Sequence, residues 1–98
     1  MPRRLRNSLP NHFVKTVVEM GWGGVKNGKL LALASRDFDA FLTVDKNLPY
    51  QQNLAALPIS VIVLAADSVE LPALLPLIPK LEAVLARLGP KSYVLIES

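Results

Sequence analysis

The sequence predicts a small α/β domain in which flanking helices cover a mainly parallel sheet. The first reason is a set of short, nearly continuous apolar runs, which are typical of strands buried on both faces; they cover residues 40–44, 59–64 and 93–96. The second reason is that segments with helical spacing of apolar residues separate these runs. The third is the length of 98 residues, which suits a single domain spanning 1–98.

Composition argues against a secreted or a membrane-spanning protein. The chain has no cysteine, which suits a reducing compartment, and 51% of its residues are hydrophobic. Its longest apolar stretch, residues 54–66, is interrupted by Pro58 and is too short to cross a bilayer, which takes about 20 residues. The basic amino end is not followed by the apolar segment of a signal peptide. We therefore expect a cytoplasmic protein with no membrane partner.

The first third of the chain predicts a helix, a strand and a glycine-rich loop. Pro2 suits the first turn of a helix over 2–9, which Pro10 ends. The β-branched run 13–18 predicts a strand. The glycines around Trp22 lack the spacing and the lysine of a phosphate-binding loop, so a tight turn anchored by the tryptophan is the favoured interpretation.

The middle of the chain predicts a helix and two buried strands. Asn27 is the expected cap of a helix over 28–35. The run 40–44 is a strand that leads into Asp45 and a polar loop over 45–54, with a helical turn near 51–54. Residues 59–64 form the clearest strand of the sequence.

The last third predicts an interrupted helix and a final strand. Asp67 or Ser68 can cap the helical region, in which leucines and Ile78 recur at helical spacing. Pro76 and Pro79 predict a break, after which a helix runs over 79–88. The strand 93–96 completes an order in which helices and strands alternate, except for a strand pair joined through a loop between the second and third helices, and this order favours a parallel sheet.

Asp45 is the strongest candidate for a functional residue, because sites in parallel sheets gather at the carboxyl ends of strands. Oxygen ligands suit Mg²⁺ or Mn²⁺, and Asn47 can supply a second oxygen. The competing interpretation is an aspartate that caps its loop. Asp37 and Asp39 precede the strand, so we expect them at the opposite end of the sheet, serving a turn. His12 is interpreted as a solvated turn residue.

Positive charge is concentrated at the amino end, which holds Arg3, Arg4 and Arg6, and the net charge is +3. Such a segment can attract a phosphate backbone. It can equally be the solvated face of a helix that keeps the protein dispersed.

Two segments carry a family resemblance. Residues 38–54, FDAFLTVDKNLPYQQNL, together with 16–22 and 26–28, resemble a group of small bacterial PIN-like proteins related to toxins of VapC type. The resemblance implies a three-layer sandwich that cleaves RNA with Mg²⁺ or Mn²⁺ held by three or four acids. On this resemblance Asp45 matches the third acid and serves as the catalytic and metal-binding residue. Asn47 stands where another acid often occurs, and Asn27 stands where an acid at a helix start is common.

The resemblance also has a consequence for activity. Related sequences begin with an apolar strand ending in an Asp-Glu pair, whereas this chain starts at the helix that follows. Either its start codon is assigned too late, or it is a shortened, inactive relative; in both cases the sandwich of these 98 residues is expected to lack its first strand. We therefore expect weak or absent Mg²⁺ or Mn²⁺ binding, impaired cleavage, and marginal stability or self-association. The implied partners are RNA and an antitoxin protein, and the predicted RNA contacts are Arg3, Arg4, Arg6 and Lys46. The alternatives are a non-catalytic module that binds RNA or protein, and a structural subunit of a homo-oligomer.

Overall fold

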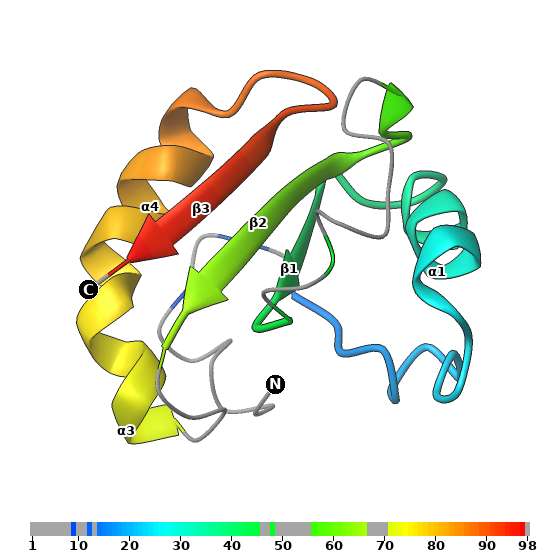
Figure 1. Cartoon of the computed structure of the whole chain (residues 1–98), viewed down its shortest axis with the longest axis horizontal. Coiled ribbons are helices and arrows are strands. Elements are labelled where there is room, and N and C mark those ends of the chain that lie inside the picture. Colours follow the sequence, from blue (N-terminus) through cyan, green and yellow to red (C-terminus); the bar gives the residue numbers. More distant parts are fainter. Residues whose placement is uncertain are drawn as a thin grey trace.

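Three parallel strands form the centre of the computed structural model, which describes residues 9, 12, 14–45, 48, 56–66 and 71–97 (Figure 1). The elements, in chain order, are α1 (Asn27–Ala34), β1 (Ala40–Thr43), β2 (Ser60–Ala65), α3 (Leu71–Leu74), the 3₁₀ turn η3 (Leu75–Leu77), α4 (Ile78–Arg87) and β3 (Tyr93–Glu97). This arrangement confirms the predicted α/β class with a small parallel sheet and flanking helices.

The sheet has the strand order β1-β2-β3, and both pairs are parallel. Phe41 lies beside Val61, and Val61 lies beside Tyr93. β2 is the central strand and its first five residues are buried, which explains why its sequence is apolar on both faces. The predicted strands 40–44, 59–64 and 93–96 are confirmed with shifts of one residue at their ends.

The two faces of β2 belong to two separate core clusters. Ile62 and Leu64 pack with Leu74, Leu77 and Leu81 of the α3–η3–α4 segment. Their neighbours in the strand point to the other face and pack with α1; this second cluster contains Val61, Val63, Leu31 and Ala34. The sheet therefore has helical segments packed on both faces, and the first five residues of β2 are buried between them.

The proline-rich segment after β2 is more regular than its sequence predicts. α3, η3 and α4 follow one another without an intervening loop, because Pro76 and Pro79 both occupy the first turn of a new segment, where a proline has no backbone donor to lose. The 3₁₀ turn takes the place of the predicted break. The predicted caps Asp67 and Ser68 lie outside the described residues, as do residues 2–8 of the first predicted helix and the turn at 51–54.

The predicted strand 13–18 is wrong for its described part. Thr16 and Glu19 form a reciprocal pair of hydrogen bonds: the Glu19 N–H donates to Thr16 Oγ1, and the Thr16 N–H donates to Glu19 Oε1, both at 3.1 Å. This is the capping-box geometry of Thr-x-x-Glu, and it folds residues 17–20 into a turn. The side-chain hydrogen bonds outweigh the preference of Val17 and Val18 for extended backbone.

Two glycines shape the loop that follows. Gly21 and Gly24 have φ angles of 75° and 83°, which only glycine adopts without strain. Trp22 packs between them on the α1 cluster and meets the Phe38 ring edge-on, with the ring centroids 6.5 Å apart. The interpretation of this segment as a tight turn with a tryptophan anchor is confirmed. Within the described ranges, no helix is both long and apolar enough to cross a bilayer.

Candidate functional site at the carboxyl end of β1

Asp45 lies just beyond the carboxyl end of β1 and is held in place from both sides. Its N–H donates to Thr43 Oγ1 at 3.1 Å, and its C=O accepts from the Leu48 N–H at 3.2 Å. Leu48 is completely buried, so this hydrogen bond ties the Asp45 backbone to the core. The carboxylate is half-buried. Asp45 therefore occupies a fixed position at the edge of the sheet where ligands of parallel folds bind.

Asn27 approaches Asp45 from the first turn of α1. Asn27 Nδ2 donates to Asp45 Oδ2 at 3.5 Å, across 18 positions of sequence. The prediction that Asn27 caps the helix is wrong, because Lys26 is the N-cap residue and makes no side-chain cap bond. Asn27 is instead the first helical residue, and its side chain reaches the neighbouring strand. The positive end of the α1 dipole also favours a carboxylate at this place.

The donor set of this site does not fit a resident divalent metal ion. Asp45 supplies one carboxylate, and Asn27 uses its amide nitrogen toward it, whereas hydrolytic metal sites usually need two or more carboxylates. Among the residues that the structure describes, no three His, Asp or Glu side chains come together. The second candidate ligand, Asn47, lies outside them, as do the predicted RNA contacts Arg3, Arg4, Arg6 and Lys46.

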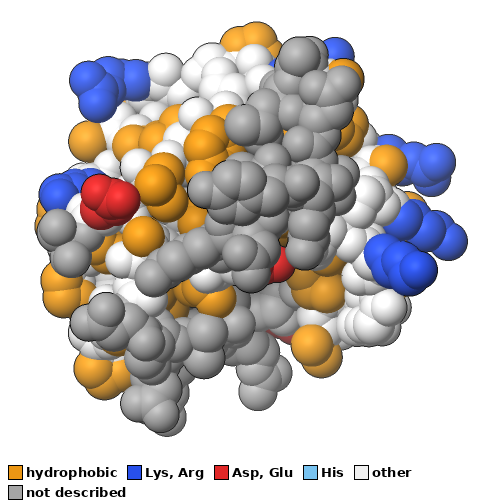
Figure 2. All heavy atoms as spheres, viewed as in Figure 1, with side chains coloured by type: hydrophobic (Ala, Val, Ile, Leu, Met, Phe, Trp, Pro, Cys, Tyr) orange, Lys and Arg blue, Asp and Glu red, His pale blue; other side chains and the backbone are white. Residues whose placement is uncertain are grey.

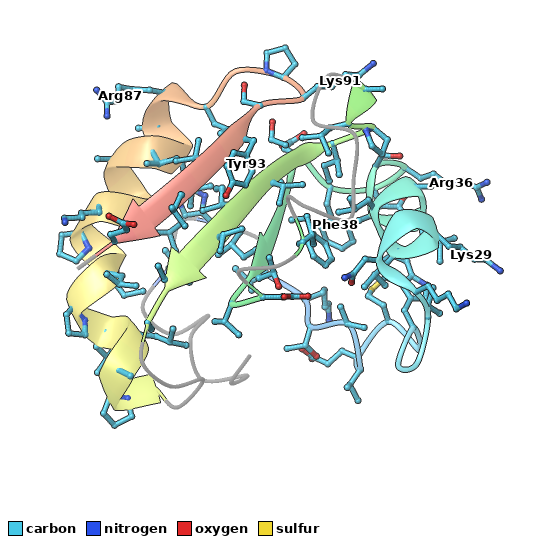
Figure 3. The ribbon with its side chains drawn as sticks, in the orientation of Figure 1. Lys29, Arg36, Phe38, Arg87, Lys91 and Tyr93 are labelled. Atoms are coloured by element: carbon cyan, nitrogen blue, oxygen red, sulfur yellow. The ribbon has the colours of Figure 1, made fainter. Side chains whose placement is uncertain are left out.

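Basic side chains accompany this site along α1. Lys26, Lys29 and Arg36 are all exposed, and Figure 3 shows Lys29 of α1, and Arg36 just after the helix, projecting away from the sheet. Figure 2 shows several Lys and Arg side chains gathered on the same side of the molecule. We call these three residues the α1 basic strip. The prediction from sequence did not select it; Lys26 is the N-cap residue of α1, Lys29 lies within the helix, and Arg36 follows its C-cap.

The opposite end of the sheet holds a cavity of about 500 Å³. Ala40 and Ser60, the first residues of β1 and β2, line it, together with Asp39 and His12. Asp39 is therefore at the amino end of β1, as predicted, and the cavity is separate from Asp45. His12 is about one-third exposed, and its Nε2 lies 3.6 Å from Glu82 Oε2. Among the described residues that line it, Asp39 is the only carboxylate, so the size of the cavity alone does not make it the better candidate.

No family model, no curated protein and no solved structure matches this chain.

Proposed function

We propose that this chain is a PIN-like, RNA-directed protein of the toxin–antitoxin kind whose metal site has been reduced to the Asp45–Asn27 pair. The 3.5 Å contact between these side chains is the observation that supports this most directly. It brings together the two described positions at which related sequences have acids. An antitoxin protein would be its protein partner, and the cytoplasm its compartment.

The chemistry of the pair favours binding over cleavage. A phosphodiester hydrolase of this type needs a divalent ion to activate water and to neutralise the developing charge. A single half-buried carboxylate hydrogen-bonded to an amide holds such an ion weakly. We therefore propose that RNA cleavage is impaired in this chain, and that Asp45 serves mainly to fix the start of α1 against the end of β1.

The α1 basic strip is the proposed RNA contact among the described residues. Lys26 directly precedes Asn27, Lys29 follows it by two positions, and both are exposed. Lysine and arginine neutralise backbone phosphates and release counterions, which makes such binding strong at low salt and weak at high salt. RNA bound along α1 would place its backbone next to the carboxyl edge of the sheet.

The test measures binding and cleavage of a labelled single-stranded RNA in the same samples. We expect Lys29→Glu combined with Arg36→Glu to weaken binding by about tenfold or more, because each reversal removes one phosphate contact and adds repulsion. Arg87→Glu is the matched control, since Arg87 is exposed on α4 at the far side of the molecule (Figure 3). Its affinity should change little.

Measuring the rate of RNA cleavage distinguishes a chain with an impaired metal site from an active nuclease. With Mn²⁺ present, we expect the wild-type chain to cleave RNA no faster than Asp45→Ala. Rapid Mn²⁺-dependent cleavage that Asp45→Ala abolishes would contradict the reduced site. Equal RNA affinity in the Lys29→Glu/Arg36→Glu and Arg87→Glu variants would contradict the proposed RNA contact.

A further inference from the structure

β3 is an edge strand, and some of its backbone N–H and C=O groups point away from the sheet. The Val61 N–H donates to the Ser92 carbonyl at 2.8 Å, and β2 and β3 are parallel. In a parallel ladder alternate residues direct their backbone groups to the same neighbour, so Ser92, Val94 and Ile96 face β2. Leu95 and Glu97 therefore direct their N–H and C=O groups away from the sheet. No strand of the described part of the chain lies beyond β3.

The side chains of β3 differ sharply between its two faces. Val94 and Ile96 pack in the cluster beneath α4. Leu95, on the opposite face, has 45% of its surface exposed, although its sheet neighbour Val63 is completely buried. Three large hydrophobic side chains of the described residues are exposed, and Leu95 is the one that lies on a strand. Hydrophobic side chains gather over β3 in Figure 2.

We infer that the outer edge of β3 binds β3 of a second copy of this chain in antiparallel orientation, with Leu95 at the two-fold axis. In this register Leu95 lies opposite Leu95 of the second copy, and their outward N–H and C=O groups exchange hydrogen bonds. Val94 then lies opposite Ile96 of the second copy, on the face covered by α4. Two three-stranded sheets become one continuous sheet, which leaves neither β3 as an open edge.

The charges at the ends of β3 favour a second copy in this orientation. Lys91 precedes the strand and Glu97 ends it, and both are exposed. Antiparallel pairing brings the Lys91 end of one strand to the Glu97 end of the other, whereas parallel pairing would bring like charges together. On the same α4 side, Lys80 Nζ donates to the Glu97 carbonyl at 2.6 Å, which terminates the open edge just past Leu95. The charges at the two ends of β3 are therefore complementary to those of a second, antiparallel β3. This inference does not depend on the proposed function.

Cysteine cross-linking tests the register, because the chain contains no cysteine of its own. Opposed residues of a hydrogen-bonded antiparallel pair have Cα atoms about 5.5 Å apart, within the range of a disulfide. We expect Leu95→Cys to form a covalent dimer under mild oxidation. Leu75→Cys is the matched control, because Leu75 is 44% exposed but lies on η3. It should remain monomeric on a non-reducing gel.

Light scattering after size exclusion tests the association itself. The wild-type chain should elute at twice the chain mass and dissociate on dilution. Leu95→Lys should elute as a folded monomer with unchanged circular dichroism, because it places two lysines opposite each other at the axis. Leu75→Lys should remain dimeric. A monomeric wild type, a dimer that persists in Leu95→Lys, or equal cross-linking of the two cysteine variants would overturn the inference.

Discussion

Asn27 Nδ2 donates to Asp45 Oδ2 at 3.5 Å and thereby joins the first turn of α1 to the end of β1. The contact places an amide beside the Asp45 carboxylate, which is fixed at this edge of the sheet. An amide and a carboxylate hold each other without any cation, whereas two carboxylates at the same separation would repel. The identity of residue 27 therefore decides whether the site is closed by a hydrogen bond or needs a cation.

Replacing Asn27 by Asp should convert the pair into a cation site. Two carboxylates at this separation supply the charge and the oxygen ligands that Mn²⁺ or Mg²⁺ require. We expect Mn²⁺ to bind at least about tenfold more tightly than in the wild type, which corresponds to about 1.4 kcal/mol, as measured by calorimetry. Without metal the variant should melt at a lower temperature. The control is Asn27→Asp combined with Asp45→Asn, which keeps one carboxylate and should show no gain.

Among the serines that the structure describes, Ser60 should be the most costly to lose. It is buried at the start of β2, where its hydroxyl donates to the Gly89 carbonyl at 2.7 Å and accepts from the Ser92 N–H at 3.0 Å. Ser60→Ala leaves both backbone groups without this partner, so we expect a loss of about 1–3 kcal/mol in the free energy of unfolding, measured in urea. Ser35→Ala removes only a bond to the Ala32 carbonyl at the end of α1 and should cost less. Equal losses would contradict this account.

Gly24 should tolerate alanine less well than Gly23 does. A Cβ at either position meets no atom within 4 Å, so crowding does not separate them. Gly24 has a φ of 83°, however, and an L-residue held in this region costs about 1–2 kcal/mol. Thermal unfolding should therefore show a lower melting temperature for Gly24→Ala than for Gly23→Ala. Indistinguishable melting temperatures would mean that the turn rearranges around the new side chain.

Leu81 anchors α4 on the sheet, and its truncation should be severe. It is completely buried in the cluster that contains Ile62 and Leu64. Leu81→Ala should cost about 2–5 kcal/mol through lost burial and the cavity that remains. Leu75→Ala, in the turn before α4, removes a side chain that is 44% exposed and should cost much less. The comparison is made by chemical denaturation at equal protein concentration, since both variants retain Leu95.

The strands were predictable because burial on both faces imposes a continuous apolar sequence. β2 shows this most clearly, since Val61 through Leu64 are all completely buried. The run 13–18 has similar composition but was wrongly predicted as a strand, because composition does not reveal that Glu19 bonds back to Thr16. The Thr-x-x-Glu spacing was the available signal.

The candidate site was predictable in part. Asp45 could be placed at the carboxyl end of β1 because it comes after an apolar run, and Asp39 could be placed at the amino end because it comes before that run. The partnership of Asp45 with Asn27 could not be derived from local pattern, because it depends on how α1 packs beside β1. The capping preference of asparagine predicted that the Asn27 side chain would bond to the backbone of α1. Tertiary packing instead directs this side chain to Asp45, just after β1. A local sequence pattern carries no information about contacts between segments that are far apart in the sequence.

The parallel order of the strands also governs when the fold can form during synthesis. β2 is enclosed only after β3 has paired with it, and the hydroxyl of Ser60 meets Ser92 across 32 positions of chain. Until α4 and β3 have left the ribosome, the most apolar strand has one bare edge and one face without its helix. We therefore expect that the nascent chain does not fold strand by strand and needs shielding until β3 has been made.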